Sequence, residues 1–376
     1  METSGKKPKS SHDSEVLGRN ITTKTSKESE FIYGLLSAAV TALIVSLGAH
    51  HWTVQVIADG SLYDNSRWGR LPAAYETISE SEGESVIFIG SSRFYTGIDG
   101  NCMEDESRLG MNYWNLAVRG DVPYLRLPET ELLSDSGARI VMIEAGPNSF
   151  SSGIGTPEHR LRWQVFSMNY DIDTNESWYD LILDHDTKYL LDDRMKRLDF
   201  IRKGLGGSSE EFAHRALNFG EGSYVSKDGR LPEPNSSDWL YSLKTPPSDT
   251  PGVIEGSDFS DYIGDLVEGD FWKPSSENHS NRLAIEHISS ELENAGIEVI
   301  FFSAPVHPEF LNSIPDSHWD QFNNSRDYFS KSFHFIDWTW ETWAPEDFTD
   351  PHHFSEQGKI MLCKELTSEI EDYLGG

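Results

Sequence analysis

The chain has 376 residues, which is enough to bury a sizeable core and predicts one large domain or two smaller ones. Its 62 acidic residues outnumber 31 basic ones, and the formal net charge of -31 disfavours nucleic acid as a partner because phosphates are repelled. The acids are spread along the whole chain. That distribution is typical of proteins from a high-salt environment, where salt screens the repulsion, and an ordinary acidic soluble protein is the alternative.

The N-terminal part divides into a polar leader and an uncharged apolar segment. Residues 1–30 are rich in Ser, Thr and Lys and predict a disordered cytoplasmic tail. Residues 31–52 contain no Asp, Glu, Lys or Arg and are long enough to cross a bilayer as a helix. Because basic residues precede this segment, we expect a single-pass anchor in the cell membrane with residues 50–376 outside. A cleaved signal peptide and a buried core helix are the alternatives.

After this segment the chain alternates apolar runs with helical spacers. Residues 53–84 predict a linker and a first helix, and the later runs predict strands at 85–90, 113–118, 139–144, 298–302 and 334–336. Helices are expected from Pro123 to about residue 133, at 281–294 and at 355–373. This alternation is the βαβ pattern of an α/β protein with a parallel sheet.

Residues 151–275 interrupt the pattern. They are polar and rich in Gly and Pro, with short helical pieces such as residues 178–191. We therefore expect a long insertion or cap rather than a second core of comparable size.

The two cysteines, Cys102 and Cys363, do not have the spacing of a zinc or haem site. We expect no metal and no other cofactor. The two residues either form one disulfide outside the cell or are two buried thiols.

Residues that can carry acyl-transfer chemistry follow the predicted strands. This chemistry needs a nucleophile, a base, a group that orients the base, and donors for an oxyanion. Ser92, His353 and Asp350 can fill the first three roles. The backbone N–H groups of Ser92 and Gly120 and the side-chain amide of Asn148 can serve as the donors.

Each of these pieces also has a plainer interpretation. Gly90-Ser91-Ser92 and Gly146-Pro147-Asn148 have the composition of ordinary turns. Asp350-Pro351-His352-His353 is also consistent with a helix-entry turn, or with metal ligands of a phosphoesterase. The joint order of the pieces favours the catalytic interpretation, with His352 as the alternative base.

Four blocks in this order resemble the SGNH (GDSL-like) hydrolase superfamily: Gly90-Ser91-Ser92, residues 115–120, Gly146-Pro147-Asn148 and Asp350-Pro351-His352-His353. The resemblance covers roughly residues 84–150 and 280–376. It implies a three-layer α/β/α sandwich with a central flavodoxin-like parallel sheet in residues 85–376. It also implies Ser92, Asp350 and His353 as the triad, and Ser92, Gly120 and Asn148 as the oxyanion hole. Ser91 stands where the family commonly has Asp.

The anchor and Pro305-Val306-His307-Pro308 resemble a membrane-anchored subset that adds or removes acyl groups, as in alginate O-acetylation and teichoic acid D-alanylation. That resemblance implies an esterase or O-acyltransferase acting on acylated cell-surface glycans or small esters, with a membrane-bound acyl donor protein as partner. Arg93, His307 and His352 are expected near the pocket. Together with the acidic surface, it implies a halophilic archaeon. The alternative is a catalytically silent SGNH-like module that binds glycan or scaffolds an assembly complex.

Overall fold

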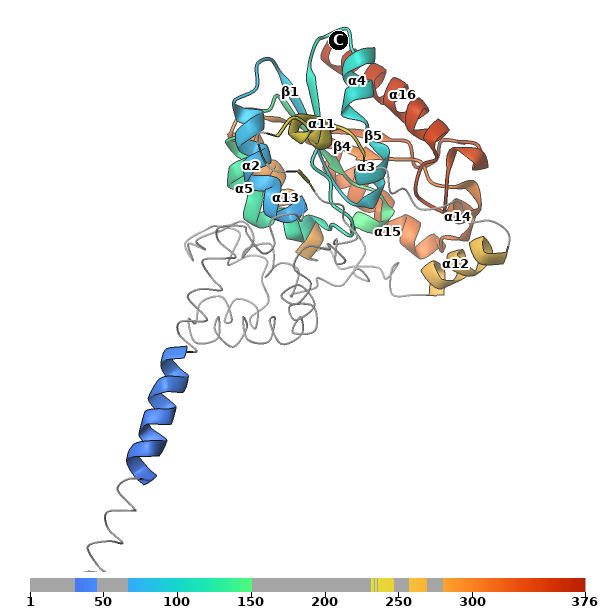
Figure 1. The fold of residues 1–376 in the computed structure, drawn as a ribbon. Coiled ribbons are helices and arrows are strands. Elements are labelled where there is room, and N and C mark those ends of the chain that lie inside the picture. The colour runs from blue at the N-terminus through green and yellow to red at the C-terminus, as the bar shows by residue number, and fades with distance from the viewer. Residues whose placement is uncertain are drawn as a thin grey trace, which may run out of the picture. The chain divides into compact units, whose positions relative to one another are not determined.

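The computed structural model describes residues 31–45, 67–150, 231–246 apart from 233 and 235, 257–268 and 280–375 (Figure 1). The chain divides into two compact units, residues 1–59 and residues 60–376.

The first unit contains a helix over residues 31–45, whose large apolar side chains are exposed. Within the described ranges, no helix has both the length and the apolar character needed to cross a membrane. The predicted tail at 1–30 and the remainder of the predicted anchor, residues 46–52, lie outside the described residues.

A five-stranded sheet forms the centre of the second unit, with all neighbouring strands parallel. Its strands are β1 (Ser85–Ile89), β2 (Asn112–Asn115), β3 (Ile140–Glu144), β4 (Glu298–Ser303) and β5 (His334–Asp337). Their order in the sheet is β2-β1-β3-β4-β5. The predicted α/β class is confirmed. Strand β2 lies on one side of β1 and β3 lies on the other, so the strand order reverses between β1 and β3. Open sheets bind ligands at the carboxyl ends of the strands at such a point.

Two hydrophobic clusters lie on the two faces of the sheet, because successive side chains of a strand point to opposite faces. Ile87 and Ile89 of β1 belong to one cluster, whereas Val86 and Phe88 belong to the other. The first cluster includes residues of α2 (Arg67–Ser79), α5 (Thr130–Ser134), α13 (Ser280–Asn294) and α15 (Asp316–Phe329). The second includes residues of α3 (Ser92–Gly97), α4 (Gly100–Glu106) and α16 (Glu356–Gly375). Helices therefore cover both faces (Figure 1).

Several elements differ from their predicted form for local reasons. The helix expected from Pro123 is a 3₁₀-helix (η1, Pro123–Glu129) followed by the short α5, since Pro128 has no N–H to donate to an α-helical ladder. Strand β2 ends at Asn115 rather than at residue 118, because the Asn115 side chain bonds the local backbone. Its Oδ1 accepts from the Ala117 N–H at 3.1 Å, and its Nδ2 donates to the Ile98 carbonyl at 2.8 Å.

Two helices are described within the predicted insertion, α11 (Trp239–Lys244) and α12 (Ser257–Glu268). Trp239 and Leu243 are buried in the first hydrophobic cluster. The Trp239 indole N–H also donates to Thr77 Oγ1 of α2 at 2.9 Å. This part of the insertion therefore packs into the main core. The predicted helical piece at 178–191 lies outside the described residues.

The two cysteines form a disulfide, which resolves the alternative left open by the sequence. Cys102 of α4 and Cys363 of α16 are bonded across a Cα–Cα distance of 6.2 Å and a sequence separation of 261 residues. The bond therefore closes a loop that contains most of the second unit.

Replacing both Cys102 and Cys363 by Ser should lower the free energy of unfolding by about 2–4 kcal/mol, because the unfolded chain loses a long-range constraint. Denaturant unfolding of the two proteins in high salt measures this difference. As a control, a reducing agent should shift the midpoint of the wild type and leave the double variant unchanged. Equal stability of both proteins would contradict the prediction.

Candidate active site

Ser92 lies at the carboxyl end of β1, where it is the first residue of α3. Ser91 precedes it as the N-cap, with its Oγ accepting from the Arg93 N–H at 3.5 Å. Gly90 allows the close approach of β1 and β3, because a Cβ at this position would lie 2.6 Å from Glu144 side-chain atoms. The turn that carries Ser92 therefore lies against Glu144 with no room for a side chain at position 90.

His353 bridges Ser92 and Asp350. Its Nε2 lies 2.8 Å from Ser92 Oγ, and its Nδ1 lies 2.6 Å from Asp350 Oδ2. The carboxylate of Asp350 holds the Nδ1–H tautomer, so that Nε2 is free to accept the proton of the Ser92 hydroxyl. The structure thus brings together the three residues that the sequence predicts as nucleophile, base and orienting group.

Asp350 is itself held by the backbone of its own loop. Its Oδ1 accepts from the N–H groups of His352 and His353, both at 2.9 Å. Burial by itself would raise the pKa of Asp350, but the His353 hydrogen bond and the two nearby imidazoles hold that pKa well below its ordinary value. Asp350 is therefore ionised at neutral pH, as the orienting role requires.

His352 is the neighbour of the base and has a different environment. Burial, followed by the charge of His353, lowers the pKa of His352 to about 3. Its ring packs among aromatic rings, 6.3 Å from Phe310 and 6.2 Å from Tyr262 of α12 between centroids. His352 is thus a neutral side chain beside the triad, and the hydrogen bond to Ser92 belongs to His353.

Two of the predicted oxyanion donors, Gly120 and Asn148, lie in the segments that follow the strands flanking β1. Gly120 follows β2 and has a φ of +65°, which is the left-handed region that favours glycine. Asn148 follows β3 within the 3₁₀-helix η2 (Pro147–Phe150), and its side-chain Oδ1 is buried without a hydrogen-bond partner among the described residues. Because β1 lies between β2 and β3 in the sheet, the two loops lie on opposite sides of the Ser92 loop.

Glu144, at the end of β3, anchors the turn that carries the nucleophile. Its carboxylate accepts from the Ser91 N–H at 2.6 Å and from the Ser91 hydroxyl at 3.1 Å. The guanidinium of Arg93 lies 3.9 Å away and also donates to the Pro305 carbonyl at 3.1 Å. Sequence reasoning missed Glu144, although an acid that ends an otherwise apolar strand is a usable signal.

Arg93 and His307, predicted as pocket residues, brace the loops around the site. The Arg93 side chain is only 3% exposed and links the loops after β1, β3 and β4. The ring Nδ1 of His307 caps α14 (Pro308–Ser313) by accepting from the Glu309 N–H at 3.2 Å, while the backbone N–H of His307 donates to the Pro351 carbonyl at 3.0 Å. Both residues therefore position backbone next to the triad.

A buried charge network supports the Gly120 loop and was not predicted. Arg126 donates to Asp121 Oδ2 at 2.5 Å and to Glu129 Oε1 at 2.8 Å, and the Tyr75 hydroxyl donates to Glu129 Oε2 at 2.9 Å. Burial, which outweighs the attraction of Arg126, raises the pKa of Asp121 to about 7. One arginine thus bonds to two buried acids, and one of these, Asp121, directly follows Gly120.

Asp350, His352 and His353 also offer ligand atoms within 4.8 Å of one another, which is compatible with a metal ion. In this arrangement both ring nitrogens of His353 already bond to protein groups, Ser92 and Asp350. Asp350 Oδ1 likewise accepts two backbone N–H groups. The donor set therefore fits proton transfer better than metal binding.

Neither a scan against models of known protein families nor a search of curated proteins finds a match for this chain.

The two adjacent histidines should differ sharply when they are replaced. His353→Gln should nearly abolish labelling of Ser92 by a fluorophosphonate, because only the His353 ring bonds to Ser92 Oγ. His352→Gln is the matched control and should retain most of the labelling rate. Labelling that depends on His352 and not on His353 would contradict the assignment of the base.

The raised pKa of Asp121 gives stability a particular pH dependence. The folded protein holds this proton to a higher pH than the unfolded chain, so the stabilisation is complete below about pH 4 and is lost as pH rises to about 7. Asp121→Asn should therefore remove part of the fall in melting temperature across this range. Calorimetry of both proteins at several pH values measures the effect, and parallel curves would contradict it.

Proposed function

We propose that this protein is a serine-dependent acyl-ester hydrolase or O-acyltransferase of the SGNH type, acting on acylated cell-surface glycans. The observation that carries the proposal is the hydrogen-bonded chain from Ser92 through His353 to Asp350, with distances of 2.8 and 2.6 Å. The parallel sheet with helices on both faces and the position of Ser92 at the carboxyl end of β1 support it as well.

The geometry supports a two-step reaction. Ser92 Oγ attacks the ester carbonyl carbon while His353 Nε2 takes the hydroxyl proton, and the tetrahedral oxyanion accepts hydrogen bonds from the Ser92 and Gly120 N–H groups and the Asn148 amide. The intermediate then collapses, and the departing alcohol oxygen takes the proton from His353. The acyl group remains as an ester on Ser92.

The second step completes the cycle and decides the class of enzyme. Water or a sugar hydroxyl attacks the acyl-enzyme and gives its proton to His353. The Ser92 oxygen leaves and recovers that proton. Water yields hydrolysis, and a sugar hydroxyl yields transfer to a glycan. Both outcomes use the same residues, so the proposal includes both.

We also propose that the catalytic unit works outside the cell, on an N-terminal anchor, and receives acyl groups from a membrane-bound donor protein. Disulfides persist in oxidising compartments, and the Cys102–Cys363 bond supports an external location. The uncharged helix over residues 31–45, with its exposed apolar side chains, supports the anchor.

A metal-dependent phosphoesterase is the second candidate function, because Asp350, His352 and His353 offer three ligand atoms close together. Such an enzyme would lose activity on a phosphate ester when treated with EDTA. The serine mechanism predicts acetyl-ester turnover that EDTA does not change.

Ser92→Ala should reduce acetyl-ester turnover by roughly 10⁶-fold, to near background, and should abolish fluorophosphonate labelling, because the nucleophile is removed. Ser91→Ala is the matched control and should keep the label, since its hydroxyl bonds to Glu144 and not to His353. Both variants should be measured in high salt against the wild type. Full activity of Ser92→Ala would overturn the proposal, whereas an unlabelled wild type would favour the catalytically silent glycan-binding module.

A further inference from the structure

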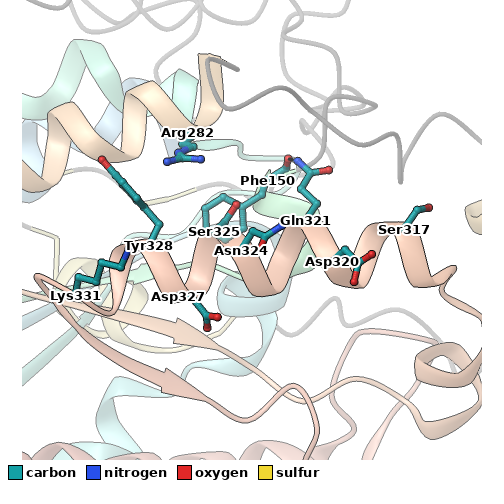
Figure 2. A pocket seen from close by; sticks show the side chains of 10 residues that line it. All are labelled: Phe150, Arg282, Ser317, Asp320, Gln321, Asn324, Ser325, Asp327, Tyr328 and Lys331. Carbon is teal, nitrogen blue, oxygen red and sulfur yellow. Dashed lines mark hydrogen bonds between the residues drawn. The ribbon is translucent and has the colours of Figure 1, made fainter.

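A polar groove lies between α15 and the first turn of α13, and no residue of the triad lines it (Figure 2). Its volume is about 580 Å³, which lies in the range of sites that hold small molecules. Figure 2 shows that most of the lining side chains come from successive turns of α15, with Arg282 of α13 facing them across the groove.

The α15 side of the groove is a regular row of polar groups. Asp320, Asn324 and Tyr328 recur at intervals of four residues, which places them on one face of the helix. Among the described residues, the side chains of Asp320 and Asn324 have no hydrogen-bond partner, and the ring of Tyr328 is 43% exposed. The row therefore offers an acceptor, an amide and an aromatic surface to a ligand.

The charges of the groove balance one another. Asp320 and Asp327 are matched in number by Arg282 and Lys331. Arg282 itself pairs with Glu286 at 3.2 Å, and Asp327 pairs with Arg326 at 2.9 Å. The Arg282 guanidinium also lies 4.1 Å from the Tyr328 ring centroid. The groove has no excess of positive charge to attract an anion, and the protein has a net charge of -31, whereas an uncharged ligand rich in hydroxyls can donate and accept along the whole row.

The groove is connected to the candidate active site through η2. The Gln321 amide donates to the carbonyl of Phe150, the last residue of η2, and Asn148 lies two residues earlier in the same short helix. Because α15 precedes the parallel strand β5, its first residues lie at the carboxyl edge of the sheet, where Ser92 also lies. The row from Ser317 to Tyr328 extends ~16 Å at ~1.5 Å per residue, which is long enough for more than one sugar ring.

We infer that this groove binds an uncharged, hydroxyl-rich saccharide chain and holds one end of it near Asn148. The inference rests on the proposed function, for which it supplies the place where the glycan lies. It concerns binding alone, and so it can fail while the acyl chemistry succeeds.

The test is ligand binding to the full chain carrying Ser92→Ala, in high salt, by saturation-transfer NMR and calorimetric titration. The probes are the neutral tetrasaccharides maltotetraose, cellotetraose and mannotetraose, with tetragalacturonate as the anionic counterpart. At least one neutral probe should bind, and tetragalacturonate should bind at least about tenfold more weakly, because its carboxylates would lose hydration in a groove with no excess of positive charge.

Two groove variants identify the site. Tyr328→Ala and Asn324→Ala should each weaken the neutral probe about five- to tenfold, since each loses one contact. Asn323→Ala is the matched control on the same helix, does not line the groove, and should bind as the parent does. Asn324 is exposed, so its replacement should leave the thermal melt of the protein unchanged. Tyr328→Ala also removes the contact with Arg282, so its melt is measured beside its binding.

The inference is overturned if no neutral probe binds, if tetragalacturonate binds equally well, or if both groove variants bind as the parent does. Fluorophosphonate labelling of wild-type Ser92 in the same preparation separates these results from a failure of the proposed function. Labelling without saccharide binding refutes the groove alone, and binding without labelling refutes the acyl chemistry alone.

Discussion

Two hydrogen bonds on the His353 ring join Asp350 of the same loop to Ser92, which lies 261 residues away in the chain. The geometry of the candidate site depends on these two bonds, because Ser92 follows the first strand of the sheet and the Asp350 loop follows the last one. For the imidazole to meet both partners, the Ser92 turn and the loop before α16 must each be held at a set position. Much of the surrounding structure can be understood as meeting that requirement.

Buried polar groups hold the turn that carries the nucleophile, Ser92, in its position. Glu144 binds the backbone and hydroxyl of Ser91, and Arg93 extends the contact to the loop after β4. Removing one partner would leave a buried charge uncompensated, which is costly, so these groups act as a unit. The same reasoning applies to Asp121, which directly follows Gly120. Its bond to the buried Arg126 holds the end of a predicted oxyanion loop against the core.

The loop that carries Asp350 and the base His353 is supported by a disulfide bond and by aromatic packing. The Cys102–Cys363 disulfide fixes α16, the helix that follows the Asp350 loop, to α4. His307 meets the same loop through its bond to Pro351, and α12 contributes Phe259, whose ring lies 4.5 Å from the His307 ring. A segment from the predicted insertion therefore packs beside the candidate site.

The sequence by itself determined the features that are local in the chain. Apolar runs that end in Gly-containing turns predicted the parallel sheet, and they placed Ser92, Gly120 and Asn148 after successive strands. The Asp350-x-x-His353 spacing let one short loop carry both base and orienting group. These predictions needed only periodicity and turn chemistry, because a strand end and a loop are specified by adjacent residues.

Tertiary structure alone decided which distant groups meet. The hydrogen bond to Ser92 is made by His353, the base that the Asp350-x-x-His353 spacing predicts, and not by its neighbour His352. The disulfide, the Glu144 contact with Ser91 and the groove along α15 each depend on long-range packing. Sequence patterns show which side chains a helix or strand presents together, whereas the partner across the fold is set by how helices pack on the sheet. That is why the sequence left the disulfide as one of two alternatives and did not predict the Glu144 contact or the groove.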